Sequence, residues 1–153
     1  MTSAEQLSKD ELAAWRTFME MQEVLRGRLE AQLQTDSSLS NPDYTVLVAL
    51  SEASHGQMRA LYLGHSLQWE KSRLHHQLTR MGKRGLVERH SGEGRASYVA
   101  ITAEGRAALA AAAPAHSRHV RRLVFDRLTQ QQTQQLGQIS RTILDGLRHD
   151  LSG

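Results

Sequence analysis

The sequence predicts a mainly α-helical protein with one β-hairpin in its second half. Apolar residues recur every three or four positions through most of the chain, and they alternate with polar residues only after Gly85. Aromatic residues make up 5% of the sequence, and alanine and leucine supply much of its apolar content, which favours helices over strands. The 153 residues are enough for one ordinary core.

The first half of the chain contains four predicted helices. The first covers residues 8–34 and is broken by "TDSSLSNPDY". Pro42 then marks the start of a second, short helix, because proline in the first helical turn loses no needed N–H group. After the predicted loop "SEASHGQ", two further helices are expected at residues 59–67 and 70–83.

Two strands and two helices follow. "LVERH" and "SYVAIT" predict the strands of the hairpin, with "SGEGRA" as its turn. Thr102 is placed to cap a helix over residues 103–127, in which Pro114 predicts a kink near Ala110. A last helix is expected over residues 129–147. Its apolar face consists of Leu136, Ile139, Ile143 and Leu147.

The helix predicted at residues 70–83 is apolar on one side and cationic on the other. At 3.6 residues per turn, Leu74, Leu78 and Met81 fall on one side. Residues 69–95 hold seven Lys or Arg and three Glu, so the positive charge of the chain is concentrated there. This layout predicts a helix that packs one side on its own domain and lays the other in the DNA major groove; the alternative is an ordinary solvated face.

The residues assigned to DNA binding lie on the cationic side and at the hairpin tip. Lys71, Lys83 and Arg84 are expected to contact phosphates, and Arg95 is expected to enter the minor groove, unless it only pairs with Glu93. The residues expected to face bases or adjacent phosphates are Ser72, Arg73, His75, His76, Thr79 and Arg80.

Together these elements predict a winged helix-turn-helix core of three helices plus a β-hairpin wing, over residues 39–103. Long terminal helices, in residues 1–38 and 104–153, have apolar faces with no obvious partner in that core. We expect them to form a dimerisation domain and the chain to be a homodimer.

The chain resembles the MarR family of bacterial transcription regulators along nearly its whole length. The resemblance is carried by "LSNPDYTVLVAL", "GHSLQWEKSRLHHQLTRMGKRGLVERH", "GRASYVAITAEGRAAL" and "APAHSRHVRRLVFDRLTQQQ". It implies a homodimer that binds a palindromic double-stranded DNA operator, usually as a repressor, and is often released by a small lipophilic ligand. Residues 69–81 match the family's recognition helix, whereas Gln68 stands where the family often has glycine and Gly82 where it often has an acidic residue.

The resemblance also suggests a ligand pocket between the terminal helices and the winged helix. Aromatic and methionine side chains suit a small lipophilic molecule, although for each residue alone core packing is the better explanation. The candidate lining residues are Trp15, Met19, Tyr44, His65 and Trp69.

Metal binding is the alternative for a regulator of the same fold. The chain has no cysteine, which excludes disulfides, thiolate metal sites and thiol redox sensing. His116 and His119 are three residues apart on a predicted helix, so they could bind zinc in a metal-sensing regulator. The alternative is that both are ordinary surface histidines. We assign no metal ligand and expect no cofactor.

Other classes of protein are disfavoured by what the sequence lacks. It has no G-x-S-x-G, P-loop or dinucleotide-binding motif, so we expect no enzyme activity. It shows neither a basic leader before an apolar run nor a stretch of about 18 apolar residues, so we expect a cytoplasmic protein with no membrane partner. A helical protein-interaction module remains as the rival outside the regulators.

Overall fold

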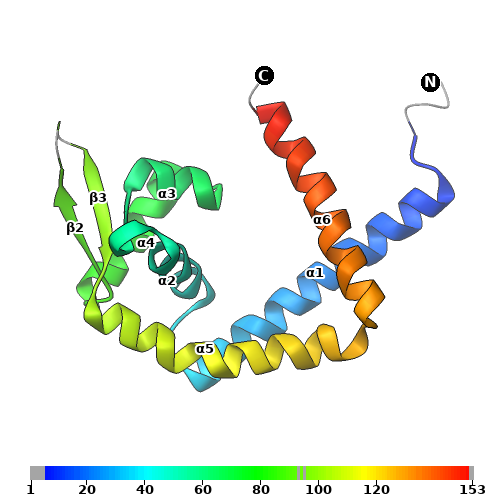
Figure 1. Ribbon diagram of the computed structural model, residues 1–153, viewed down its shortest axis with the longest axis horizontal. Coiled ribbons are helices and arrows are strands. Elements are labelled where there is room, and N and C mark those ends of the chain that lie inside the picture. The colour runs from blue at the N-terminus through cyan, green and yellow to red at the C-terminus, as the bar shows by residue number, and fades with distance from the viewer. Residues whose placement is uncertain (1–5, 93, 95, 152–153) are drawn as a thin grey trace. The chain divides into compact units, whose positions relative to one another are not determined.

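The computed structural model describes residues 6–92, 94 and 96–151. The elements, labelled in Figure 1, are α1 (Lys9–Asp36), α2 (Asn41–Glu52), η2 (Ser54–Gly56), β1 (Gln57–Arg59), α3 (Ala60–Leu67), α4 (Lys71–Lys83), β2 (Val87–Ser91), β3 (Ser97–Ile101), α5 (Ala103–Leu123), η4 (Phe125–Arg127) and α6 (Gln130–Leu151). This order confirms the predicted mainly α-helical class with a winged helix-turn-helix core.

The chain divides into two compact units, residues 1–116 and residues 117–153. The first unit contains α1 to α4, the three strands and most of α5, and the second contains the end of α5 and all of α6.

Both N-terminal helices begin with a capping box. Ser8 and Glu11 exchange side-chain and backbone hydrogen bonds at the start of α1, and Ser40 and Asp43 do the same at the start of α2. Each box pairs two N–H groups that a helix start would otherwise leave without a partner. Pro42 lies in the first turn of α2, as predicted.

The wing is part of a three-stranded antiparallel sheet with the order β1-β3-β2. Met58 of β1 and Arg89 of β2 both pair with Val99 of the central strand. The sequence analysis predicted the hairpin correctly but missed β1, placing its residues in a loop and in the start of a helix. A strand of only three residues is too short to show alternation.

The C-terminal helices are present as predicted but end at other residues, and α6 continues to Leu151 rather than stopping at residue 147. Thr102 caps α5 as predicted, since its Oγ1 accepts from the Gly105 amide at 2.9 Å. However, α5 ends at Leu123 rather than at residue 127, because the chain tightens into the short 3-10 helix η4. Pro114 lies within α5 without ending it.

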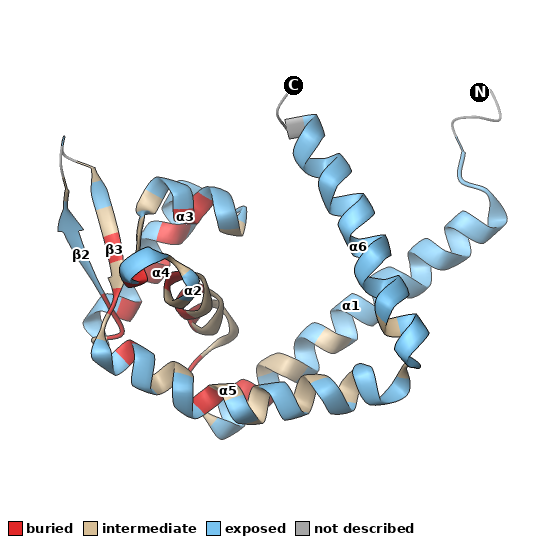
Figure 2. Ribbon diagram, in the orientation of Figure 1, coloured by how far each residue is buried: buried red, intermediate tan, exposed pale blue. Residues whose placement is uncertain are grey.

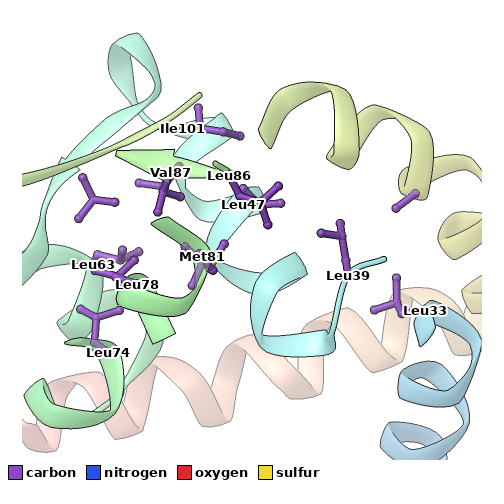
Figure 3. Close-up of a cluster of buried hydrophobic side chains, with 14 residues drawn as sticks. Leu33, Leu39, Leu47, Leu63, Leu74, Leu78, Met81, Leu86, Val87 and Ile101 are labelled. Atoms are coloured by element: carbon purple, nitrogen blue, oxygen red, sulfur yellow. The ribbon is translucent and has the colours of Figure 1, made fainter. Parts of the chain in front are cut away.

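The core forms where α2, α3 and α4 pack against the sheet. Its fully buried side chains include Leu47, Leu50, Leu63, Leu78 and Val99, several of which are drawn in Figure 3. Figure 2 shows most of the buried residues on these elements. At about 1.5–3 kcal/mol for each large apolar side chain removed from water, this cluster is the main source of stability of the first unit.

The terminal helices instead leave large apolar side chains exposed. Over residues 9–36, only Gln32 and Leu33 are buried. In α6 the predicted apolar face is exposed in full: Leu136, Ile139, Ile143 and Leu147 are between 37% and 60% exposed. Figure 2 shows most of the described part of α6 as exposed and none of it as buried.

The turn between α3 and α4 generates a stability prediction. Gln68 ends α3 in the left-handed region, at φ +57°, where side chains other than glycine are strained. We expect Gln68→Gly to raise the free energy of unfolding by about 1 kcal/mol. Gln68→Val should lower it by about as much or more, because a β-branched residue fits this region worst. Urea unfolding at fixed protein concentration measures both, and a valine variant as stable as the glycine variant would contradict the account.

Candidate nucleic-acid interface

The amphipathic division predicted for α4 is present in the structure. Leu74, Leu78 and Met81 are buried in the core, as predicted, and a fourth residue, Gln77, is buried with them. The exposed residues of the helix are Lys71, Ser72, Arg73, His75, His76, Thr79, Arg80, Gly82 and Lys83. All eight candidate DNA-binding residues between residues 71 and 83 are thus exposed, and Gly82 is the ninth exposed residue of the helix.

The start of α4 is held by the turn that precedes it. The side-chain amide of Gln68 donates to the His65 carbonyl at 2.9 Å, which braces the left-handed turn. The guanidinium carbon of Arg73 lies 4.3 Å from the centre of the Trp69 ring. A cation over an aromatic face is attracted to it, so Trp69 restricts where the Arg73 side chain can point.

The wing is joined to α4 by Arg89 of β2, which the sequence analysis did not assign to the site. Its guanidinium lies 2.9 Å from Nδ1 of His75 and donates to the Ser97 hydroxyl at 3.4 Å. Because guanidinium only donates, Nδ1 of His75 must accept, and a neutral ring then carries its proton on Nε2. The only sequence signal for Arg89 was its place in a charged segment where apolar and polar residues alternate, as in a strand.

A hollow of about 1030 Å³ lies between α3, α4 and the wing. Leu74 and Leu78 contribute to its lining, and the polar side chains around it include those of Lys71, His76 and Arg89. A concave surface edged by cations suits an anionic partner.

On the opposite side of α4, Arg84 bonds to α2 and to the segment before it. Its guanidinium donates to Oδ2 of the buried Asp43 at 2.5 Å and to the Ser38 carbonyl at 2.6 Å. Burial alone would raise the pKa of the Asp43 carboxyl. The hydrogen bonds from Arg84 and from Ser40, together with the positive charge of Arg84, hold that pKa below its ordinary value of 3.8.

Two residues of the predicted set need separate mention. Arg95, with Glu93, lies outside the described residues. Thr79 is exposed, but its hydroxyl donates to the His75 carbonyl of its own helix at 2.8 Å.

The five candidate ligand residues lie in different places. Tyr44 lines a hollow of about 630 Å³ with Val48, Met58 and Leu67, and its ring centre lies 4.5 Å from that of His116. Burial raises the pKa of Tyr44. His65 and Trp69 line the hollow between α3, α4 and the wing instead.

The other two candidate ligand residues belong to α1. Trp15 is 53% exposed and Met19 is 44% exposed, and neither lines the two hollows just described. The structure therefore brings together His65 with Trp69, but not all five residues.

The predicted histidine pair has other partners. His116 packs on Tyr44, and Nδ1 of His119 accepts from Arg122 at 2.9 Å. Within residues 6–92, 94 and 96–151, no group of three or more His, Asp or Glu side chains is arranged to hold a metal ion. Within the same ranges, no helix has the length and apolar character needed to cross a membrane.

The chain is similar to several solved structures. Sco3205 of Streptomyces coelicolor, a MarR family transcriptional regulator solved in complex with DNA, is 35% identical with a TM-score of 0.88, over 93% of this chain and 94% of that one. AbsC, a MarR family transcriptional regulator of the same organism, is 35% identical with a TM-score of 0.87, over 94% and 98%. The regulator BldR of Sulfolobus solfataricus, at 22% identity and a TM-score of 0.71 over 95% and 99%, shares the fold. No family model matches the chain, and no curated protein matches it.

The buried carboxylate generates a prediction about pH. Because the pKa of Asp43 is lowered by folding, its contribution to stability is complete above pH 3.8 and is lost as the pH falls through its lower folded value. We expect Asp43→Asn to lower the free energy of unfolding at pH 7 by about 2 kcal/mol, the scale of charged hydrogen bonds lost in a buried site. In urea unfolding series the difference from the wild type should narrow below pH 3.8. A difference that stays constant down to pH 2 would show that the carboxylate charge is not its cause.

Proposed function

Because this chain belongs to the MarR family of transcriptional regulators, we propose that it binds double-stranded DNA as a homodimer and represses transcription from a palindromic operator. It acts by binding and not as an enzyme. The observation that carries the proposal is the division of α4, in which Leu74, Leu78 and Met81 are buried and the opposite surface is exposed and cationic. A helix in the major groove needs such an anchored side and such a free side.

The exposed residues divide by the contacts that their chemistry allows. Lys71 and Lys83 neutralise phosphates. Arg84 can also contact a phosphate, but only through the guanidinium N–H groups that are not bonded to Asp43 and Ser38. Arg95 stays our prediction for the minor groove, and Arg89 of the wing is suited to the DNA backbone beside α4. The residues that face bases or neighbouring phosphates are Ser72, Arg73, His75, His76, Thr79 and Arg80.

Dimerisation is supported by the apolar side chains that the terminal helices leave in water. Exposed apolar surface on this scale marks an interface. A second copy of the chain is the partner that also explains the operator, since a two-fold dimer places two recognition helices roughly 34 Å apart, one DNA turn.

A small lipophilic effector would bind in the hollow beside Tyr44. The ring pair of Tyr44 and His116 gives this hollow one aromatic wall, and Met58 and Leu67 give apolar surface. The hollow is lined by residues of α1, α2, α3, β1 and α5, so an occupant would contact both the winged helix and the long helices α1 and α5. Release of DNA would follow from a shift in the separation of the two recognition helices.

The DNA-binding proposal is tested by selecting bound duplexes from a random pool. We expect a palindromic sequence, and an affinity for it that falls steeply with salt because bound cations displace counterions from DNA. Lys83→Ala should weaken binding to all sequences and reduce the salt slope by about one. The control is Arg28→Ala, which removes a cation from the exposed part of α1. No selected sequence together with no salt dependence would leave the protein-interaction module as the better account.

The dimer is tested on α6. Ile139 is 60% exposed in the single chain, so a charge there does not disturb the core of the chain itself. We expect Ile139→Glu to halve the mass measured by sedimentation while leaving the helix content unchanged. Gln135→Glu adds the same charge to a polar exposed position of α6 and should remain dimeric. A monomeric wild type, or a dimeric Ile139→Glu, would refute the interface.

A further inference from the structure

Two polar side chains are buried between α2 and α4 in the middle of the winged helix. Asp43 is 3% exposed and Gln77 is 5% exposed. Polar groups at this depth are costly unless they are hydrogen-bonded, and these two are bonded to each other: Nε2 of Gln77 donates to Oδ1 of Asp43 at 2.6 Å. None of the roles proposed above for α4 uses this pair.

The chemistry of the pair fixes which way the Gln77 amide faces. A carboxylate only accepts hydrogen bonds, so Gln77 must turn its NH₂ group toward Asp43. Its carbonyl oxygen is thereby directed to the other side, where it accepts from the guanidinium of Arg80 at 2.8 Å. The position of the acceptor that Arg80 meets is therefore set by Asp43.

Asp43 is itself held in place from the other end. Its Oδ2 accepts from the Ser40 amide at 3.0 Å and from Arg84, which also donates to the Ser38 carbonyl. A continuous series of hydrogen bonds thus leads from the connection between α1 and α2, through Asp43 and Gln77, to an arginine on the exposed surface of α4.

We infer that Asp43 and Gln77 are positioning residues for sequence readout, which hold the guanidinium of Arg80 in one orientation on the surface that meets DNA. The inference rests on the proposed function, since Arg80 can read a base only if α4 lies on DNA. Arginine recognises guanine with two parallel hydrogen bonds, which requires the guanidinium to lie in one plane. An arginine without this support still attracts phosphate, so its loss affects discrimination between sequences more than attraction to DNA.

The test measures discrimination at single base pairs of the selected operator. For each protein, the affinity for the operator is divided by the affinity for operators with one base pair changed. Arg80→Lys keeps the charge but not the planar fork, and should lower discrimination at one base pair of each half-site by about tenfold. Gln77→Met keeps the length of the side chain and removes its hydrogen bonds. It should lower discrimination at that same base pair by at least about threefold, and add nothing to Arg80→Lys in the double variant.

The matched control is Gln32→Met. Gln32 is also a buried glutamine that donates to a carboxylate at 2.6 Å, that of Asp36, but it lies on α1. The Gln32→Met variant should discriminate between the operator and its single-base-pair variants as the wild type does. A Gln77→Met protein that discriminates like the wild type, or that loses affinity equally for every sequence, overturns the inference.

A measurement on the wild type covers the case in which Gln77→Met does not fold. In the free protein, the Nε–H group of Arg80 should have a higher NMR order parameter than that of Arg28 on the exposed part of α1. Equal mobility of the two overturns the inference. If the wild type selects no DNA sequence, the proposed function fails and the inference with it, whereas a selected operator with unchanged discrimination in Gln77→Met refutes the inference alone.

Discussion

The structure depends on one constraint, the removal of Leu74, Leu78 and Met81 from water. These side chains anchor α4 to α2, α3 and the sheet, and the helical period then obliges the residues on the opposite side of the helix to face outward. The cations of α4 are exposed for the same reason that its leucines are buried. Anchoring also makes the exposed surface rigid, because a core packed at crystal-like density leaves its helices little freedom to rotate.

Polar contacts then brace α4 on both of its flanks. On one flank, Arg89 joins the wing to His75. On the other, Arg84 and Gln77 both bond to the carboxylate of Asp43. The burial of apolar side chains does not depend on their direction, whereas a hydrogen bond requires its donor and acceptor to be aligned. The core therefore decides that α4 is packed, and these contacts decide how its exposed side chains are oriented.

The terminal helices also have apolar faces, but in the single chain these faces remain exposed to water. Their apolar stripes have the spacing of a buried helix face, yet α6 has no buried residue among those described. A stripe of this kind is stable in water only when something covers it. In the homodimer that we propose, a second copy of the chain would cover the stripe and would also set the spacing of the two recognition helices.

The sequence by itself determined the helices, the hairpin, the buried side of α4 and its cationic side, because each is written in a period of 3.6 or 2 residues. It did not reveal β1, which is too short to show a period, or the left-handed Gln68. Nor did it reveal that Gln77 is buried on Asp43, a residue 34 positions earlier in the chain. Only the tertiary structure decided these points, because local pattern specifies which side of an element is buried, while the partner that a buried polar group meets depends on how distant segments pack.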